Sequence, residues 1–561
     1  MSGLIECVPN FSAGRDLDIV RQITARIESV EGATLLHVDP GKATNRTVVT
    51  FAGEPGPVVE AAFRAIAAAA DLIDMRQHSG AHPRMGATDV CPLVPISGIS
   101  MEETAEWARR LAERVGRELE IPVYLYEAAQ PNPARKNLAT IRAGEYEGLS
   151  RKMTEAAWKP DFGPAVFNPK SGATVIGARD FLVAFNVNLN TTSTRRANAV
   201  AFDVRESGRV KREGDPLTGK VIKDAAGQPV MIPGSLQAVK AIGWFIEEYG
   251  FAQVSMNLTD IAITPLHAAF AEVCRAAEAR GLRVTGSELV GLIPLSAMLA
   301  AGRYFLHRQQ RSTGVSDAEL IRIAVASMGL EDLASFTPEE RIIEYRLRKP
   351  GDDRLAELSL REFVEETASE SVAPGGGSAA AAIGALGVAL GTMVANLSAH
   401  KRGWDARWEE FSRWAEAGQR IKESLLRLVD EDTRAFGRVM DALGMPKETE
   451  ADKTARAQAL EAANIGALEV PWQTMRSAWE AFPLLRAMAE GGNPASASDA
   501  GVGALAVRAA IRGAWLNVRT NATGIKNKDA IARILTEGAK MEQAAATQES
   551  EILSIVEKKF S

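Results

Sequence analysis

The densest set of reactive side chains in this 561-residue chain lies in HSGAHPRMGATDVCP, residues 78–92. This stretch holds two of the six histidines, His78 and His82, among glycine and proline residues. Because proline removes a backbone donor and glycine disfavours helix, we predict an irregular loop. An imidazole on a rigid loop can serve as a general base near neutral pH. His82 is therefore a candidate catalytic residue; the alternative is a loop histidine that only satisfies a backbone carbonyl.

The spacing of His78 and His82 would also place two metal ligands on one face of a helix. Gly80 and Pro83 work against such a helix, and no glutamate follows His78. The three cysteines are too few and too scattered for a disulfide framework or a zinc site. We therefore expect no metal.

A second candidate lies in LLRLVDEDTRAFGRVMDAL, residues 425–443. On a helical wheel with 3.6 residues per turn, Asp432 lies at the centre of an apolar stripe, whereas Asp430 and Glu431 point elsewhere. The stripe consists of Leu425, Leu428, Val429, Phe436, Val439 and Leu443. A carboxyl group that faces a core has a raised pKa unless it is paired, which would make Asp432 a general acid near neutrality. The alternative is a buried aspartate that caps or bridges helices.

The composition is that of a soluble globular protein, with 46% hydrophobic and 24% charged residues. A formal charge of −6 argues against nucleic acid as the main partner. The N-terminus has no basic region and reaches Pro9 before any long apolar run, so we expect no signal peptide and a cytoplasmic location. Residues 372–399 carry no charge, but they are mostly alanine and glycine, so we expect a buried helix and no membrane insertion.

The elements that must position these residues alternate between strand and helix in the first part of the chain. The predicted strands are 4–11, 33–39, 45–53 and 122–127, and the predicted helices are 17–30, 54–73 and 101–118. A second unit has strands at 173–189 and 251–260, helices at 235–250 and 267–281, and an exposed hairpin insertion at 211–234. This order predicts two α+β subdomains of ferredoxin type.

From about Ser316 the pattern becomes helical, with long helices near 404–443, 453–469, 499–521 and 527–558. The expected domains are an N-terminal subdomain (1–171), a second subdomain (172–345), a linker (346–354) and an all-helical domain (355–561). Gly384, Gly387 and Gly391 fall on one helical face, where another backbone could approach closely. The backbone N–H groups of residues 374–378, at a helix start, suit an anionic ligand.

Motifs across the first half resemble glutamate formiminotransferase. They are ECVPNFSAGRD at the start, HSGAHPRMGATDVCPLVP, IRAGEYEGL at 141–149 and PDFGPAVFNPKSGATVIGARDFLVAFNVNL at 160–189. The resemblance implies transfer of a formimino group from N-formimino-L-glutamate to N5 of tetrahydrofolate, with His82 as the catalytic histidine. It also implies a folate site formed by Gly163, Pro164, Ala165, Val166, Phe167, Asn168, Pro169, Lys170, Ser171 and Gly172.

The implied chemistry suggests further substrate-binding residues. The donor carries two carboxylates, for which Arg46 and Arg84 are candidate partners, and Asp39 could meet the cationic amidine. The alternative for each is a surface salt bridge. One imidazole could take the proton from N5 and give a proton to the departing glutamate nitrogen, which contributes roughly 10²- to 10⁴-fold.

In the second half, APGGGSAAA, LVDEDTRAF and the run 492–521 resemble formimino-tetrahydrofolate cyclodeaminase, the partner normally fused to the transferase. The resemblance implies cyclisation of 5-formimino-tetrahydrofolate to 5,10-methenyl-tetrahydrofolate with loss of ammonia, and gives Asp432 the place of the active-site aspartate. Ser498, Asp499, Asn517 and Asn521 would orient the ligand, or form a cap and a buried polar network.

Together these motifs predict a multidomain bifunctional enzyme of histidine degradation and one-carbon metabolism. Its cosubstrate would be tetrahydrofolate, free or polyglutamylated, and its partners would be small molecules. We also expect self-association through the glycine-rich and C-terminal helices. One alternative is a 5-formyl-tetrahydrofolate–glutamate formyltransferase with a silent C-terminal half. Another is a non-catalytic folate-binding oligomer.

Overall fold

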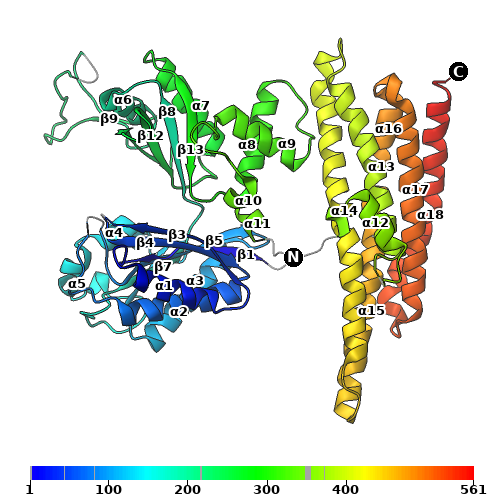
Figure 1. Ribbon diagram of the computed structural model, residues 1–561, viewed down its shortest axis with the longest axis horizontal. Coiled ribbons are helices and arrows are strands. Elements are labelled where there is room, and N and C mark those ends of the chain that lie inside the picture. The colour runs from blue at the N-terminus through cyan, green and yellow to red at the C-terminus, as the bar shows by residue number, and fades with distance from the viewer. Residues whose placement is uncertain are drawn as a thin grey trace. The chain divides into compact units, whose positions relative to one another are not determined.

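The computed structural model describes residues 3–42, 44–80, 83–214, 218–347, 355–371 and 373–560. The chain divides into two compact units. The first comprises residues 1–300 and 325–349, and the second comprises 301–324 and 350–561. The described part of the first unit contains two mixed α+β regions, and that of the second is helical (Figure 1). This confirms the prediction of a two-part α+β region followed by a helical half.

The first sheet has seven strands, and β4 pairs with β1, β2 and β3. The strands are β1 (Leu4–Cys7), β2 (Asn10–Phe11), β3 (Ala33–Gly41), β4 (Arg46–Gly53), β5 (Thr88–Ser97), β6 (Val123–Glu127) and β7 (Thr174–Ala178). Helices α1 (Leu17–Glu28), α2 (Pro55–Leu72) and α3 (Met101–Glu118) cover one face (Figure 1). Side chains alternate along a strand, so Ile5 and Cys7 enter the core under these helices while Glu6 and Val8 face the other side.

Strand β7 marks where the first α+β region ends. It runs parallel to β5 and β6 and pairs with both, which makes it part of the first sheet. The predicted boundary at 171–172 places this strand in the second subdomain instead. The parallel pairing moves the division between the two sheets to a point after Ala178. The predicted linker at 346–354 lies almost entirely outside the described residues, and its position stays a prediction.

The second sheet has four antiparallel strands in the order β11-β12-β8-β13. They are β8 (Val183–Leu189), β11 (Val239–Ile246), β12 (Phe251–Leu258) and β13 (Val284–Val290), with helices α6 (Thr194–Val204) and α7 (Leu266–Glu278). Between α6 and β11 in the sequence, β9 (Arg209–Val210) and β10 (Met231–Ile232) form a separate two-stranded antiparallel sheet. Other helices of the chain are α4 (Leu138–Arg142), α5 (Glu145–Lys152), α8 (Leu295–Arg308), α9 (Asp317–Met328), α10 (Pro338–Arg341) and α11 (Ile343–Arg346). The ferredoxin-type assignment stays a prediction.

The predicted helix at 235–250 is wrong, because residues 239–246 form β11. All eight residues of this strand pair with β12. Gly243 packs so closely on α6 that an added Cβ would lie 2.2 Å from the backbone nitrogen of Asn198. Sheet pairing and this close packing override the helix-like spacing of the apolar residues.

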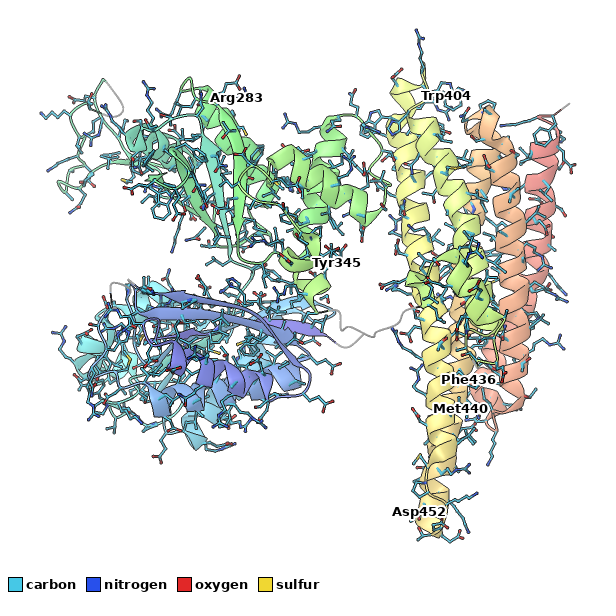
Figure 2. The ribbon with its side chains drawn as sticks, viewed as in Figure 1. Arg283, Tyr345, Trp404, Phe436, Met440 and Asp452 are labelled. Atoms are coloured by element: carbon cyan, nitrogen blue, oxygen red, sulfur yellow. The ribbon has the colours of Figure 1, made fainter. Side chains whose placement is uncertain are left out.

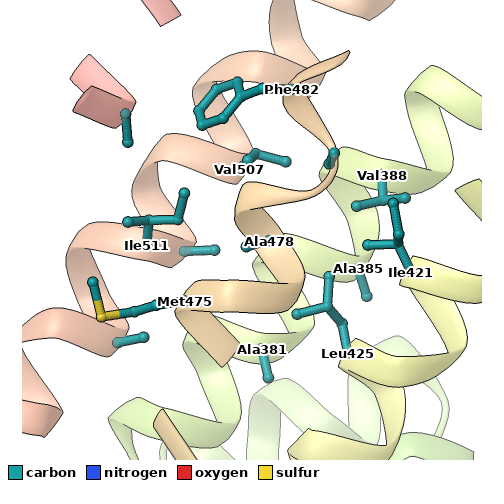
Figure 3. Packing of buried hydrophobic residues seen from close by; sticks show 14 of the residues in the cluster. Ala381, Ala385, Val388, Ile421, Leu425, Met475, Ala478, Phe482, Val507 and Ile511 are labelled. Atoms are coloured by element: carbon teal, nitrogen blue, oxygen red, sulfur yellow. The ribbon is translucent and has the colours of Figure 1, made fainter. Parts of the chain in front are cut away.

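The helical unit contains seven α-helices in residues 355–371 and 373–560. They are α12 (Leu360–Thr367), α13 (Gly376–Ala399), α14 (Trp408–Gly444), α15 (Glu450–Trp479), α16 (Phe482–Gly491), α17 (Ala497–Thr523) and α18 (Lys528–Glu557). Side chains from α13, α14, α15 and α17 interlock in its core (Figure 3). Residues 301–324 also belong to this unit: the Gly314 carbonyl oxygen accepts hydrogen bonds from the side chains of Asn396 at 2.9 Å and Gln419 at 3.2 Å.

Helix α13 packs against its neighbours through small residues. An added Cβ would lie 3.1 Å from the Ala510 side chain at Gly384 and 2.8 Å from the Gly503 carbonyl oxygen at Gly387. The predicted close approach of another backbone is confirmed at Gly387, where the partner is α17, whereas Gly391 packs against the Leu485 side chain of α16. In the described part of the chain, α13 is the one helix long and apolar enough to cross a membrane, and 61% of its most apolar window is buried.

Candidate active sites

The loop that carries His82 is anchored on both sides of that residue. His82 itself lies outside the described residues, so its catalytic role stays a prediction. His78 Nε2 is 2.9 Å from the Asn45 carbonyl oxygen, and His78 Nδ1 accepts a hydrogen bond from Arg84 Nε at 3.2 Å. Burial lowers the pKa of His78. His78 is therefore a neutral ring with its proton on Nε2, and its two hydrogen bonds hold the loop in place.

Arg84 is held by carboxylates of the protein itself. Its guanidinium donates to both carboxylate oxygens of Glu147, at 2.6 and 2.9 Å, and to Glu145 at 3.2 Å. Hydrogen bonding to Glu147 raises the pKa of Arg84. Arg84 thus ties the loop to α5, and it is not among the residues that line the large cavity described below. The structure does not bring it together with Asp39 and Arg46.

The predicted folate segment, residues 163–172, runs along the same loop. The Lys170 carbonyl oxygen accepts from the Met75 N–H and the Ser171 carbonyl oxygen from the Ala87 N–H, both at 2.8 Å. The Phe167 ring packs on Tyr146 with ring centroids 5.4 Å apart. None of these ten residues lines the large cavity. The segment therefore adjoins the histidine loop.

A cavity of about 1000 Å³ lies in the first unit, against the face of the first sheet that α1–α3 leave uncovered. Its wall carries both signs of charge. The acidic side chains are Glu6, Asp39, Glu127, Asp180, Glu206 and Asp260, and the basic ones are Arg46, Arg142, Arg179 and Lys240. Arg142 is already ion-paired with the buried Asp89. The cavity can therefore accept a small molecule that carries both positive and negative groups.

Asp39 and Arg46 are brought together in this wall, on the paired strands β3 and β4. The Arg46 guanidinium donates to the side chain of Asn10. Its Nε is buried without a hydrogen-bond partner, and burial lowers the pKa of Arg46. A guanidinium with an unused donor in a cavity wall is suited to bind a carboxylate.

Glu6 is a candidate that inspection of the sequence missed. It is 6% exposed, and burial raises its pKa to about 7, with Arg179 acting in the opposite direction. The signal was available in the alternation of LIECV, where the apolar Ile5 and Cys7 flank Glu6. Such a pattern in a strand predicts a carboxylate on the face opposite the helices.

In the helical unit, Asp432 lies at the N-terminus of α13. Its Oδ2 accepts a hydrogen bond from the Ser378 N–H at 2.9 Å. An added Cβ at Gly377 would lie 2.2 Å from Asp432 Oδ1, so only glycine leaves room for the carboxyl group. Burial raises the pKa of Asp432, against the opposing hydrogen bonds from Ser378. The position predicted for an anionic ligand at this helix start is thus taken by a carboxyl group of the protein itself.

The apolar stripe of α14 is only partly covered. Leu425 and Val429 are buried, but Phe436 (Figure 2) and Leu443 are 41% and 42% exposed. The expectation that the whole stripe faces a core is wrong for its C-terminal part. Asp430, which the wheel points elsewhere, is buried. Asp432 therefore lies where the buried part of the stripe gives way to an exposed one.

The four polar residues predicted on α17 are separated. Asn517 faces Gly376, where an added Cβ would lie 3.5 Å from its amide nitrogen, and Asn521 donates to the Ala467 carbonyl oxygen at 2.7 Å. Ser498 and Asp499 are at the other end of α17, about 27 Å from Asn517 at 1.5 Å per residue. Within one chain the helix brings Asn517 to the Asp432 site, and it keeps Ser498 and Asp499 away from it.

The molecule thus presents two sites with different chemistry. One is a cavity of mixed charge beside a histidine-bearing loop, and the other is a shielded carboxyl group at a helix start. Three family models match the chain: "Formiminotransferase domain, N-terminal subdomain" over residues 4–179, "Formiminotransferase domain" over 184–348 and "Formiminotransferase-cyclodeaminase" over 359–540. Together the matches span nearly the whole chain and include both sites.

Individual relatives agree with these matches. The chain is 42% identical over 522 residues to the formimidoyltransferase-cyclodeaminase of Mus musculus, covering 93% of each chain. It is 39% identical over 306 residues to the glutamate formimidoyltransferase of Streptococcus pyogenes, covering 54% of this chain and 94% of that one. It is 36% identical over 170 residues to the methenyltetrahydrofolate cyclohydrolase of Methylorubrum extorquens, covering 30% and 82%. The two sites therefore lie in a protein that belongs to the formimidoyltransferase-cyclodeaminase family.

Proposed function

We propose that this protein is a bifunctional enzyme of one-carbon metabolism and histidine degradation. The first unit transfers the formimino group of N-formimino-L-glutamate to N5 of tetrahydrofolate. The helical unit then closes 5-formimino-tetrahydrofolate to 5,10-methenyl-tetrahydrofolate and releases ammonia. The observation that carries the proposal is the shielded Asp432 carboxyl group, whose raised pKa suits the protonation of a poor leaving group.

In the transfer step, N5 of tetrahydrofolate attacks the formimino carbon and loses a proton, while the glutamate nitrogen gains one as it leaves. His82 is proposed as the group that moves both protons. Arg46, with its unused Nε donor, would bind a carboxylate of glutamate. Asp39 lines the same wall, and contact of Asp39 with the donor stays a prediction. The neutral His78 and the ion-paired Arg84 would hold the loop in place.

In the cyclisation step, N10 attacks the formimino carbon, and the bond from that carbon to the amine nitrogen then breaks. The amine leaves as ammonia only after it has gained a proton. Asp432 is proposed as the acid that supplies this proton, because its burial favours the protonated form at a higher pH than is usual for aspartate. Asn517 is close enough to the glycine-rich start of α13 to orient the bound folate.

Tetrahydrofolate is the proposed cosubstrate of both steps. Support for its site along residues 163–172 comes from the way this segment adjoins the histidine loop. Polyglutamylated folate as the natural form and a cytoplasmic location stay predictions.

We also propose that the chain pairs with a second copy of itself through α13. Its exposed face carries large apolar side chains at helical spacing, namely Ile383, Leu386, Met393 and Leu397. The neighbouring α17 adds Val502 and Leu505. A contiguous apolar face of this kind favours association. Light scattering of the wild type and of a Leu386→Glu variant tests this: a single-chain mass for the wild type would contradict it.

One assay tests both activities. Purified protein is mixed with tetrahydrofolate and formimino-glutamate, and ammonia and the ultraviolet band of methenyl-tetrahydrofolate are followed. Production of both supports the proposal. Transfer without ammonia would contradict the second step, and no turnover with folate still bound would favour a binding protein. Transfer only from 5-formyl-tetrahydrofolate to glutamate would favour the formyltransferase, which the names of the relatives do not favour.

A further inference from the structure

Glu6 occupies an unusual place in the cavity wall. Strand β1 lies between β4 and β5, and the residues that pair with Glu6 are Ala52 and Val94. Paired residues of neighbouring strands point to the same face, so two apolar side chains flank this carboxyl group. Ala52 and Val94 are fully buried and Glu6 nearly so. A carboxylate in such surroundings is poorly solvated.

Few groups of the protein stabilise the ionised form of this buried carboxyl group. Among the described residues, no hydrogen bond to the Glu6 side chain is found. The charged groups near it are Arg179, which lowers its pKa, and Glu344 of α11, which raises it, and the net pKa is about 7. The side chain of Arg179 is also engaged elsewhere, because it donates to the Asp180 carbonyl oxygen at 2.7 Å. Glu6 is therefore a buried acid without a committed partner, on a wall open to a ligand.

We propose that the Glu6 carboxylate pairs with the cationic formimino group of the donor substrate and makes the cavity select this donor over its neutral formyl analogue. The inference rests on the proposed transferase function. An amidinium presents two N–H donors in one plane, which match the two oxygens of a carboxylate as a guanidinium does. The other acidic group first assigned to this role, Asp39, is exposed on β3, where water weakens its attraction for a cation.

The two donors form an isosteric pair that isolates this effect. N-formimino-L-glutamate and N-formyl-L-glutamate carry the same two carboxylates, and they differ by a cationic nitrogen in place of a neutral oxygen. The carbonyl oxygen of the formyl ligand has no proton to donate to an ionised Glu6. Its partial negative charge is also repelled by the carboxylate. The site therefore prefers the formimino ligand because the formyl ligand cannot form the ion pair with Glu6.

Pairing of Glu6 with a bound cation couples donor binding to the release of protons. With a pKa of about 7, Glu6 is about half protonated at pH 7 in the unliganded protein. A bound cation favours the ionised carboxylate, so binding of the formimino donor should release protons, and its affinity should rise as the pH rises through 7. The formyl analogue should release none from this group. The titratable groups that interact with Glu6 are Arg179, Glu344 and Cys7, and Tyr126 and Glu127 line the same wall.

The test is calorimetric titration of the full-length protein with each of the two ligands in buffers of different ionisation enthalpy. In Glu6→Gln, which keeps the side-chain shape, the affinity for formimino-glutamate should fall at least about tenfold, as expected on removal of one partner of a buried charge pair. Affinity for formyl-glutamate should be unchanged or higher, and the proton release should disappear. Glu6→Asp keeps the charge and should retain part of the preference.

Glu28→Gln is the matched control, because Glu28 is an exposed glutamate at the end of α1, away from the cavity. It should behave as the wild type with both ligands. Equal loss of affinity for both ligands in Glu6→Gln, or an unchanged preference with normal thermal unfolding, would overturn the inference. Because binding is measured without turnover, a protein that prefers the formimino ligand but transfers nothing would contradict the proposed function and not the role of Glu6.

Discussion

The hydroxyl of Ser378 lies 2.8 Å from the Val429 carbonyl oxygen and 3.2 Å from Asp432 Oδ2. A hydroxyl has one proton, so the shorter contact with Val429 leaves only a weak hydrogen bond from the hydroxyl to Asp432. Hydrogen bonds from Ser378 to the carboxylate lower the pKa of Asp432, and burial raises it. Because the hydroxyl proton is shared with Val429, burial prevails and the carboxyl group holds its proton above the usual pH range of aspartate.

Replacement of this acid should block only the second reaction. We expect Asp432→Asn to slow cyclisation roughly 10²- to 10⁴-fold, the usual contribution of a general acid, while transfer continues. The intermediate 5-formimino-tetrahydrofolate should accumulate, which chromatography of quenched reactions can measure. Glu431→Gln, on the neighbouring residue that pairs with Arg434 at the surface, is the control and should cyclise normally. Normal cyclisation by Asp432→Asn would remove the residue from the mechanism.

The same carboxyl group should make stability and rate depend on pH. Its folded-state pKa is raised, so its contribution to stability is fully present below the unfolded pKa and is lost as the pH rises through the folded pKa. Asp432→Asn should therefore gain melting temperature relative to the wild type as the pH rises. Cyclisation by the wild type should fall over the same rise in pH. Parallel melting curves of the two proteins across this pH range would contradict the assignment.

Gly377 should be irreplaceable, because an added Cβ would lie 2.2 Å from Asp432 Oδ1. We expect Gly377→Ala to displace the carboxyl group, to lower the free energy of unfolding by about 1–3 kcal/mol and to abolish cyclisation. Gly437→Ala is the control, since Gly437 lies within α14 with no atom within 4 Å of its added Cβ. That change should stabilise the protein by about 0.5–1 kcal/mol. Chemical denaturation measures both effects.

Arg84 should act on transfer through the loop. Arg84→Lys replaces a two-pronged contact with Glu147 by a single charge, so the loop from His78 to Gly86 should loosen. We expect faster amide hydrogen exchange in that loop and a transfer rate reduced about tenfold, with cyclisation intact. Arg76→Lys changes an exposed pair with Asp74 and should have little effect. An unchanged exchange rate in Arg84→Lys would contradict this role.

Arg46 should affect substrate binding. In Arg46→Gln the cavity loses the charge that we assign to a donor carboxylate, and the KM for formimino-glutamate should rise about tenfold. The KM for tetrahydrofolate should change less. Arg26→Gln, on the exposed side of α1, is the control. Equal effects on the two substrates would indicate a general disturbance of the cavity.

Local sequence patterns predicted which way a side chain points better than they predicted which elements surround it. The helical wheel correctly turned Asp432 toward buried side chains. It could not show that α13 begins at that point, or that Phe436 would be exposed. Both depend on how the helices assemble, and the 3.6-residue period carries no information about that. Residues 239–246 were misassigned for a related reason, because their strand forms through pairing with β12.

Residue type alone also misplaced one charge and missed another. Arg84 was assigned to a substrate carboxylate, but Glu145 and Glu147, more than sixty residues away, satisfy it first. Glu6 was passed over although its alternation with Ile5 and Cys7 was visible in the sequence. What the alternation could not reveal is the cavity on that face, which residues from the second sheet help to line.

The membership of residues 301–324 in the helical unit bears on how the two activities can be separated. The chain passes from one unit to the other at 300–301, 324–325 and 349–350. Cleavage of the chain once, in the segment 346–354, would leave residues 301–324 in the N-terminal fragment, without Asn396 and Gln419, whose side chains donate to the Gly314 carbonyl oxygen. Separation of the two activities therefore requires that residues 301–324 be removed or replaced as well.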